Sequence, residues 1–478
     1  MILKKIITFD KSIALKLPDT IEGCHELIKQ LLVIVEGLER RVQDLEDKLN
    51  KNSRNSHRPP STDGLRKPAL PAKKGGKRGG QAGHKGKTLK MVGQVDETIE
   101  LKPEVCTACQ QRLGADVDFL PESKRQVFEL PPTRLHVYEY QRYSCTCGHC
   151  GHLNKADFPA GVAAPVQYGP RVKALVTLLH QNGCLSVSKI QSLFEDLFDA
   201  PLNEATIQEC QRIAYERLEI EETYIQEQLQ QSEHIHADET GVRCAGDLFW
   251  LHELGNERFT YQFVHKRRGI EAHQEEQSLL LNFKGWLLHD CWAPYFNLDE
   301  CQHALCNAHL LRELKALQER KRKWAANFHA FLLDLHKKTD QGRGQLPQHQ
   351  RPPTIRKYSR LLEAGYREEP QPQKSARGRP KKSKGRNLLE RLDMHWKAVL
   401  AFTHHKHIPF TNNLAERDIR PAKSKLKVAG CFRTLPGAQA YARTHSFIST
   451  VRKHQYNAFN ELVNIFSGLT PSYRTEGT

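Results

Sequence analysis

Two carboxylates in the second half of the chain stand where they could hold divalent metal ions. Asp238 ends the short apolar run 234–238, and Asp290 ends a second such run, 285–290. Both runs are typical of strands, so each carboxylate is expected at a strand end, exposed at a sheet edge by the turn that follows. Carboxylates at neighbouring strand ends can hold a pair of hard cations about 4 Å apart, as in-line phosphoryl transfer requires. The two positions therefore predict one metal site.

Glu416 is the candidate for a third carboxylate ligand. A run of cations follows it, and a cationic helix beside a carboxylate suits a site where a metal ion meets a DNA phosphate. These cations are Arg417, Arg420, Lys423, Lys425 and Lys427. A second interpretation stays open, because Glu416 lies three residues after Asn413 and could be the carboxylate of a capping box. Pro421 is expected to end or kink this helix, so the cations beyond it need not share one face.

Other acidic residues near these three fit the same argument. They are Glu239, Asp247, Asp299, Glu300 and Asp418. Taken singly, an acidic side chain is more often a solvated or capping group than a metal ligand. Only their order and their surroundings distinguish Asp238, Asp290 and Glu416 from these neighbours.

Two Cys-x-x-Cys pairs predict a zinc ribbon within residues 96–158. The pairs are Cys106 with Cys109 and Cys147 with Cys150. Four thiolates around one structural Zn²⁺ are the usual reading of this spacing, and residues 135–143 between the pairs alternate like a strand. Cys145 could compete with Cys147 for the metal, although Cys150-Gly151 completes a knuckle-like turn that favours Cys147. The alternative is a set of buried free thiols.

The composition favours a polyanionic partner in a reducing compartment. The net charge is +17, from 72 Lys and Arg against 55 Asp and Glu, and the excess is clustered. Clustered cations gain affinity by releasing counterions from phosphates, although general solubility is the simpler explanation. Thirteen Cys in 478 residues are too sparse for a disulfide scaffold. No apolar stretch reaches a signal peptide or the roughly 20 residues of a membrane span, so a cytoplasmic, nucleoid-associated protein is expected.

The N-terminal residues predict a helix that pairs with another copy, followed by a basic linker. Within residues 20–50, apolar side chains recur at heptad spacing, as in a short coiled coil that would make a homo-oligomer, most simply a dimer. The seam comprises Leu27, Leu31, Ile34, Leu38, Val42, Leu45 and Leu49. The alternative is one amphipathic helix packed on its own domain. Residues 51–95 are rich in Pro, Gly and cations, which is typical of a flexible linker with phosphate affinity.

The rest of the chain predicts a helical region, an α/β core and a helical tail. Residues 159–230 read as helical, and 186–198 with 204–218 resemble a helix-turn-helix in which Asn203 caps the second helix. Short apolar runs at 234–238, 248–253, 259–265 and 285–290 then predict strands, and long helices are expected over 300–338. In the polar stretch that follows, Arg377 and Arg379 flank a glycine and precede a proline, which suits an AT-rich minor groove or a disordered basic loop.

Several motifs follow one another in an order that is specific for one family. They are the leucine-rich start, Asn52-Ser53-Arg54-Asn55-Ser56 with the Pro-Pro-Ser after it, Gly-Gly-Gln-Ala-Gly-His-Lys-Gly at 79–86, the two Cys pairs, and residues 236–241, 289–295, 305–314 and 412–420. In these motifs, which cover nearly the whole chain, the sequence resembles the DDE transposases of the insertion sequence 66 family. The extra Cys145 departs from the family pattern and leaves the choice of zinc ligands open.

The resemblance implies an RNase H-like catalytic domain over 231–445 and a C-terminal helical tail over 446–478. Its catalytic triad falls on Asp238, Asp290 and Glu416, which would bind Mg²⁺ or Mn²⁺. A helical insertion at about 300–405 expands the interval of 126 positions between the last two carboxylates. The implied activity is binding of the terminal inverted repeats, then metal-dependent DNA strand cleavage and strand transfer. Companion proteins encoded by the same element are implied as well.

The family's Cys-x-x-His motif falls on Cys306 and His309, at i and i+3 on one helix face. Such a pair permits metal binding or contact with DNA, and two soft ligands alone favour a DNA-contacting or structural role over zinc. A buried core pair is the alternative. His309, Arg417 and Arg420 are expected to position DNA phosphates. A transposase-derived DNA-binding regulator without activity is the main rival function, and a zinc hydrolase of small substrates is a more distant one.

Overall fold

The computed structural model describes residues 20–49, 89–114, 118–131, 133–276, 278–372 and 382–475. The chain forms two compact units, each made of segments that are far apart in the sequence. The first unit comprises Met1–Lys67 and Glu219–Gln455, and the second comprises Pro68–Leu218 and Tyr456–Thr478. The C-terminal segment therefore belongs with the helices that precede the sheet rather than forming a separate tail.

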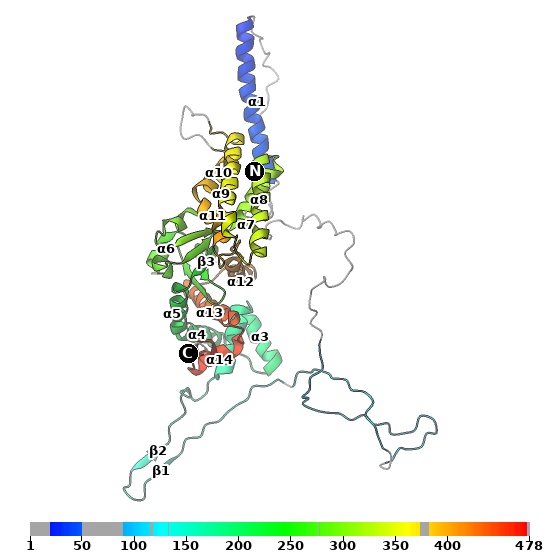
Figure 1. The fold of residues 1–478 in the computed structure, drawn as a ribbon. Helices are drawn as coiled ribbons and strands as arrows, with labels where there is room; N and C mark the ends of the chain where they lie inside the picture. Colours follow the sequence, from blue (N-terminus) through cyan, green and yellow to red (C-terminus); the bar gives the residue numbers. More distant parts are fainter. Residues whose placement is uncertain are drawn as a thin grey trace, which may run out of the picture. The chain divides into compact units, whose positions relative to one another are not determined.

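A five-stranded sheet lies at the centre of the first unit, in the order β5-β4-β3-β6-β7 (Figure 1). Its strands are β3 (His234–Cys244), β4 (Asp247–Gly255), β5 (Thr260–His265), β6 (Trp286–His289) and β7 (Gln302–Leu305). The first three strands form an antiparallel meander, whereas β6 and β7 run parallel to β3. The four strands expected from the sequence are present. β7 was not expected, because 302–305 fell within a region predicted to be helical.

A two-residue hairpin makes β3 much longer than the predicted strand 234–238. Cys244 pairs with Asp247 across the turn, and both intervening residues have positive φ, 51° at Ala245 and 90° at Gly246. Two positive φ values are the condition for a type I′ turn, whose twist matches the flanking strands. The prediction that Asp238 ends its strand was therefore wrong: Asp238 lies inside the central strand of the sheet.

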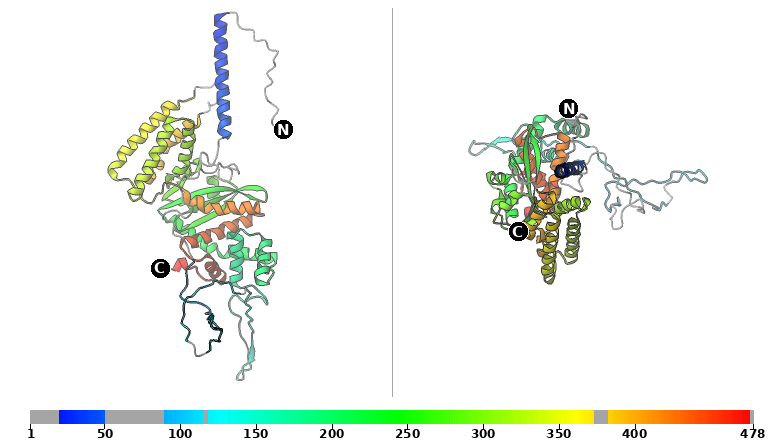
Figure 2. Two further views of the ribbon diagram at one scale, coloured as in Figure 1. Left: turned by 90° about the vertical axis from the view of Figure 1, so that its right-hand side faces the viewer. Right: turned by 90° about the horizontal axis from the view of Figure 1, so that it is seen from above.

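Two helices, α12 (Asn413–Ala429) and α13 (Leu435–Lys453), pack against the antiparallel strands (Figure 2). The core between them is apolar, with Val242, Leu251 and Val264 from the strands against Ile419, Ala422 and Tyr441 from the helices. α12 continues past Pro421, so the first of the two expected effects of this proline, an end of the helix, is not observed. Burial of Ile419 and Ala422 on either side of Pro421 offsets the missing backbone hydrogen bond.

Helices and helical turns fill the long interval between the second and third candidate carboxylates. After η4 (Ala293–Asn297) and β7 come α7 (Asn307–Glu319), α8 (Lys323–Gln341), α9 (Arg351–Glu368), α10 (Lys384–Met394) and α11 (Trp396–His404). They share a core around Trp324, Phe328, Tyr358 and Leu389, which also receives Leu288 and Leu305 from the sheet. The interval in which a helical insertion is expected is therefore largely helical, and its helices begin after β7.

The N-terminal helix α1 (Ile21–Leu49) also belongs to the first unit. Its apolar side chains at the predicted heptad positions Leu31, Ile34, Leu38, Val42 and Leu45 are about half exposed, between 47% and 58%. The helix is thus confirmed, and its apolar seam is uncovered in the single chain.

The second unit contains short helices and a small two-stranded sheet. Its elements are β1 (Ser144–Thr146), β2 (Leu153–Lys155), α2 (Pro170–Thr177), α3 (Val187–Phe198), α4 (Glu204–Arg217), α14 (Ala458–Ser467) and α15 (Ser472–Thr475). The predicted helix-turn-helix corresponds to α3 and α4, and the Asn203 side chain accepts a hydrogen bond from Ala205 N–H as a cap. Residues 135–143 are not a strand, so that prediction was wrong; β1 begins only at Ser144.

Candidate functional site

The pairing of β3 with β6 brings the first two carboxylates together. The parallel register sets His236 opposite Leu288. Asp238 and Asp290 each follow two residues later in the chain. Asp238 Oδ1 accepts the backbone N–H of Glu239 at 2.9 Å, and Asp290 Oδ1 accepts that of Trp292 at 3.0 Å. Asp290 directly follows β6, as predicted. The two side chains therefore share one end of the parallel part of the sheet.

Burial and neighbouring negative charge favour the protonated form of Asp238. Burial raises the pKa of Asp238 to about 7, and the charges of Glu239, Asp290 and Glu416 add to the increase. Because the interaction between two charges weakens as their separation grows, the contributions of Asp290 and Glu416 to this shift are consistent with their lying near Asp238. A divalent cation would relieve that repulsion.

Asn412 fixes the position of Glu416, which lies in the first turn of α12. The backbone N–H of Asn412 donates to Cys306 Sγ at 3.1 Å, and its Nδ2 donates to the carbonyl of Ala237 at 2.8 Å. Its Oδ1 lies 2.7 Å from Nδ1 of the buried His236. One side chain thus joins the start of α12 to the residue before Asp238.

The capping alternative for Glu416 does not match the contacts. α12 has no side-chain cap at Asn412, whose amide is used on β3. Glu416 Oε1 is buried and has no hydrogen bond among the described residues. Its nearest cations are His309 Nε2, 3.7 Å from Oε1, and Arg312, 4.0 Å from Oε2. A carboxylate oxygen in this condition fits a metal ligand better than a cap.

The Cys306 and His309 pair lies beside Glu416. Cys306 is buried and directly precedes α7, and His309 lies in the first turn of that helix. Ligand atoms of Cys306, His309 and Glu416 are all within 4.8 Å of one another. The sequence offered only Cys306 and His309 as potential ligands at this place, and the structure adds Glu416 as a third.

Two neighbouring acidic residues have partners of their own. Glu239 points to the other face of β3, where it pairs with Arg268 at 2.6 Å and accepts the Tyr295 hydroxyl at 2.7 Å. The Arg268 guanidinium lies over two rings, 4.8 Å from Trp250 and 4.0 Å from Trp292. Asp418 makes an ion pair of 2.6 Å with Lys453. These contacts leave neither carboxylate available as a ligand.

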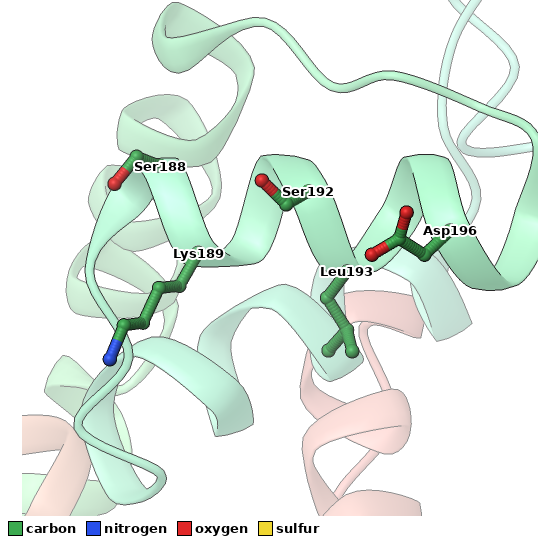
Figure 3. Close-up of a pocket in the computed structure, with 5 residues that line it drawn as sticks. All are labelled: Ser188, Lys189, Ser192, Leu193 and Asp196. Atoms are coloured by element: carbon green, nitrogen blue, oxygen red, sulfur yellow. The ribbon is translucent and has the colours of Figure 1, made fainter.

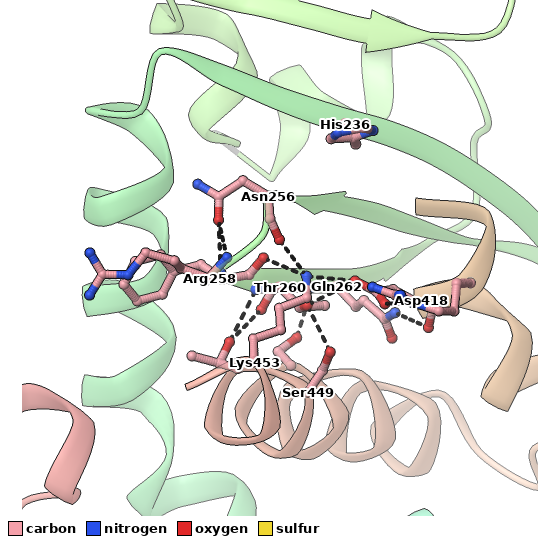
Figure 4. A network of polar contacts seen from close by, with 12 residues as sticks. His236, Asn256, Arg258, Thr260, Gln262, Asp418, Ser449 and Lys453 are labelled. Carbon is pink, nitrogen blue, oxygen red and sulfur yellow. Dashed lines mark hydrogen bonds and ion pairs between the residues drawn. The ribbon is translucent and has the colours of Figure 1, made fainter. Parts of the chain in front are cut away.

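Figure 4 shows the polar network around Asp418 and Lys453. Lys453 Nζ donates to the carbonyls of Asn256 and Phe259 at 2.7 and 2.9 Å, and Thr260 Oγ1 donates to Asp418 at 3.2 Å. Both charged side chains are 8% exposed. The network ties α12 and α13 to the turn between β4 and β5, so Asp418 has a structural role.

Glu253 is a buried carboxylate that the sequence argument did not single out. It pairs across the antiparallel ladder with Asp238, is fully buried, and has no hydrogen bond to either oxygen among the described residues. Burial raises the pKa of Glu253 well above its ordinary value, and the charges of Asp418 and Asp238 add to this. This pairing depends on the register that the two-residue Ala245-Gly246 hairpin sets.

The exposed cations of α12 share a face with Glu416. Because the helix is continuous, Arg420, Lys423 and Lys427 follow Glu416 at i+4, i+7 and i+11, which is a single stripe. Arg417, next to this stripe, is exposed as well, whereas Lys425 is buried. Arg377 and Arg379 lie outside the described residues.

The cysteine pairs form two similar turns in the second unit. Gln110 N–H donates to the Cys106 carbonyl and Gly151 N–H to the Cys147 carbonyl, each at 2.9 Å. In each turn, backbone N–H groups after the first cysteine lower the pKa of its thiol: those of Cys109 and Ala108 for Cys106, and those of Cys150 and His149 for Cys147.

Tight turns in which backbone N–H groups stabilise a thiolate are typical of zinc knuckles. Cys145 lies in strand β1 instead, which favours Cys147 as the ligand. The structure does not bring the two pairs into one cluster, since the groups of potential ligands found among the described residues lie elsewhere.

A shallow pocket lies on α3 of the second unit (Figure 3). It is lined by Ser188, Lys189, Ser192, Leu193 and Asp196. It contains none of the three carboxylates discussed above. None of the described helices combines the length and hydrophobicity that crossing a bilayer takes.

Comparisons with known proteins agree with this picture. A family model described as "Transposase IS66 family" matches residues 165–440, which is more than half of the chain. A second, described as the zinc-finger binding domain of transposase IS66, matches residues 103–151. A third, for a family of unknown function, matches residues 17–90. The search of curated proteins finds no match.

Proposed function

Because the chain belongs to the IS66 family of transposases, we propose that it binds the terminal inverted repeats of its insertion sequence and cuts and rejoins DNA with divalent metal ions. Asp238, Asp290 and Glu416 are the metal ligands in this proposal. The observation that carries it is the meeting of β3, β6 and α12, which rests on the register of β3 with β6 and on the hydrogen bond from Asn412, at the start of α12, to the carbonyl of Ala237.

The sheet topology supports an RNase H-like catalytic domain. Three antiparallel strands followed by two strands parallel to the first, in the order β5-β4-β3-β6-β7, put one carboxylate in the central strand and the next beside it. The helices α7–α11 then separate these strands from α12, which supplies the third carboxylate. In this proposal the insertion lengthens the chain between Asp290 and Glu416, and it does not change the position of Glu416 near Asp238.

The residues present fit Mg²⁺ or Mn²⁺. Carboxylate oxygens are the ligands that these hard cations prefer, and Glu416 Oε1 is buried without a hydrogen bond among the described residues. When bound, a pair of such ions activates the attacking oxygen and stabilises the leaving oxygen of a phosphodiester. Asp238, Asp290 and Glu416 would hold these ions through their carboxylate oxygens.

The protein's own contribution is to orient these ligands and the DNA. Asn412 holds α12 against β3, and the backbone N–H of Trp292 orients Asp290. The stripe of Arg420, Lys423 and Lys427 leads away from Glu416 and can follow a phosphate backbone into the site. His309 and Arg312 beside Glu416 are placed to contact the reacting phosphate. Hydrolysis of a phosphodiester at the transposon end would free a 3′-hydroxyl. Attack of this hydroxyl on a target phosphodiester would form the new bond and release a 3′-hydroxyl on the target strand.

Two further parts of the proposal concern assembly. Cys106, Cys109, Cys147 and Cys150 hold a structural Zn²⁺, as the family's zinc-binding domain supports. The uncovered seam of α1 pairs with a second copy in a coiled coil, since about half-exposed leucines and isoleucines at heptad positions are stabilised by a partner helix. Such pairing would hold two transposon ends together. Companion proteins of the same element are a further expectation.

Cleavage of terminal-repeat DNA by the purified protein, with Mg²⁺ and with a chelator, tests the function. Asp238→Asn and Asp290→Asn should each reduce cleavage and joining by at least about 10³-fold, because an amide cannot replace a charged ligand. Retarded migration of the same DNA should persist, since binding relies on many separate cations. Asp299→Asn, at an exposed carboxylate nearby, is the matched control. A wild-type protein that binds the repeats but never cuts them would instead be a regulator.

A further inference from the structure

A second group of potential ligands lies at the start of β3, apart from the carboxylates of the proposed active site. It consists of His234, His236 and Glu257, whose ligand atoms all lie within 4.8 Å of one another. The two histidines are two residues apart on one strand, so their side chains share a face. Glu257 lies in the turn between β4 and β5, and its two oxygens are 3.1 and 3.3 Å from His234 Nε2.

Hydrogen bonding fixes the tautomer of His236. Nδ2 of Asn412 donates to the Ala237 carbonyl at 2.8 Å, so the amide oxygen must be the atom that faces His236 Nδ1 at 2.7 Å. An oxygen only accepts, and therefore Nδ1 of His236 carries the proton. In a neutral imidazole the other nitrogen then has a lone pair and no hydrogen.

That lone pair on His236 Nε2 is buried and unsatisfied. His236 is 1% exposed, and Nε2 has no hydrogen-bond partner among the described residues. The Lys453 network does not reach it, since no contact joins the two in Figure 4. Leaving a buried acceptor unsatisfied is unfavourable, and histidines that bind metals commonly donate their other N–H to an oxygen, as His236 does.

We propose that His234, His236 and Glu257 bind one divalent transition-metal ion of the Zn²⁺ class. Two imidazoles and a carboxylate are a common ligand set for Zn²⁺, which takes solvent water as a fourth ligand. The site is open to entry, because the side chain of Glu257 is 61% exposed, whereas that of His234 is 14% exposed. The nearby charge of Lys453 is already compensated by Asp418 at 2.6 Å.

The scaffold of the site is rigid before any ion binds. Asn256 Oδ1 accepts the backbone N–H groups of Arg258 and Phe259 at 2.9 and 2.8 Å, which closes the turn around Glu257. His236 is held by Asn412. A bound ion would join this turn to β3 two residues before Asp238, and through Asn412 to the start of α12. The inference itself rests only on metal binding and not on the proposed DNA chemistry.

Zinc content of the full-length protein tests the proposal. After equilibrium dialysis against limiting free Zn²⁺, His234→Ala and Glu257→Ala should each lose one equivalent of Zn²⁺ per chain relative to wild type. His234→Cys should restore that equivalent, because a thiolate is also a good Zn²⁺ ligand. The matched control is His265→Ala with Glu275→Ala, which breaks a similar ion pair of 3.0 Å outside any three-ligand group among the described residues.

Two outcomes would overturn the assignment. One is an unchanged zinc content in both His234→Ala and Glu257→Ala. The other is loss of the same equivalent only in Cys306→Ser or His309→Ala, which would put the ion at the other cluster. Folding is checked by thermal unfolding: without metal the variants should unfold near the wild-type temperature, and added Zn²⁺ should raise the unfolding temperature of wild type and of the control more than that of His234→Ala or Glu257→Ala.

Discussion

Glu416 and Asp418 are two residues apart on α12, yet their surroundings are opposite. Asp418 pairs with Lys453 at 2.6 Å and accepts a hydroxyl from Thr260. Glu416 has an oxygen without a hydrogen bond among the described residues, and its ion pairs are longer, 3.7 Å to His309 and 4.0 Å to Arg312. The protein thus compensates the charge of Asp418 closely, whereas the contacts of Glu416 are looser. One helix therefore carries, on opposite faces, a carboxylate that anchors it and the carboxylate that we propose as a metal ligand.

The largest expected effect is a difference in strand cleavage between variants of Glu416 and variants of Asp418. Glu416→Gln should lower strand cleavage by at least about 10³-fold, or about 4 kcal/mol of transition-state stabilisation, with little loss of folding stability. The substitution removes repulsion from the other carboxylates and weakens only the long ion pairs of Glu416 with His309 and Arg312, at 3.7 and 4.0 Å. Strand cleavage and thermal unfolding of the same preparations measure both effects. If Glu416→Gln cuts normally while a folded Asp418→Asn is inactive, the third ligand has been misassigned.

The second effect concerns stability. Lys453→Met should lower the free energy of unfolding by about 3 kcal/mol, because it leaves the buried charge of Asp418 without its partner. Replacing both, as Asp418→Leu with Lys453→Met, should recover much of that loss, since an apolar pair needs no desolvated charge. Urea unfolding of the single and double variants gives the interaction free energy between Asp418 and Lys453. Losses that simply add would show that the pair is not the anchor of α12.

The smallest effect is a pH dependence from Asp238. Its pKa is about 7 in the folded chain and 3.8 ordinarily, so the folded state binds the proton more tightly. The resulting stabilisation is complete below pH 4 and is lost as the pH rises through 7. Between pH 5 and 8, metal-free wild type should lose about 2 to 3 kcal/mol more stability than Asp238→Asn.

The matched control for this pH experiment is Asp299→Asn, which should follow wild type. Saturating Mg²⁺ should weaken the dependence, because the cation displaces the proton. If the free energy of unfolding, measured with urea, changes with pH in the same way for wild type and Asp238→Asn, the raised pKa of Asp238 is contradicted.

Sequence patterns were sufficient where local chemistry decides the structure. The apolar runs before Asp238 and Asp290 predicted β3 and β6, and Asn203 predicted the start of α4. The cations after Glu416 were recognised, although Pro421 suggested an interruption that tertiary packing overrides. β7 was missed because four residues, Gln302–Leu305, are too short for periodicity to distinguish a strand from a helix.

Contacts between distant segments were beyond the reach of such patterns. Asn412 was noticed only as part of a motif, whereas its side chain joins α12 to β3 across 175 positions. The His234, His236 and Glu257 group depends on the turn between β4 and β5, and the pairing of Glu253 with Asp238 depends on the hairpin register. Each of these needs the three-dimensional arrangement, because no spacing in the sequence encodes it.

The long helical insertion before α12 has a consequence for protein synthesis. Asp290 and Glu416 are 126 positions apart, so at about 5 to 20 residues per second the third carboxylate leaves the ribosome roughly 6 to 25 s after the second. Until then the growing chain also lacks α12 and α13, which cover Val242, Leu251 and Val264 on the sheet. A chain that stops early therefore exposes an apolar sheet face and lacks Glu416, and the exposed face favours its removal by proteolysis.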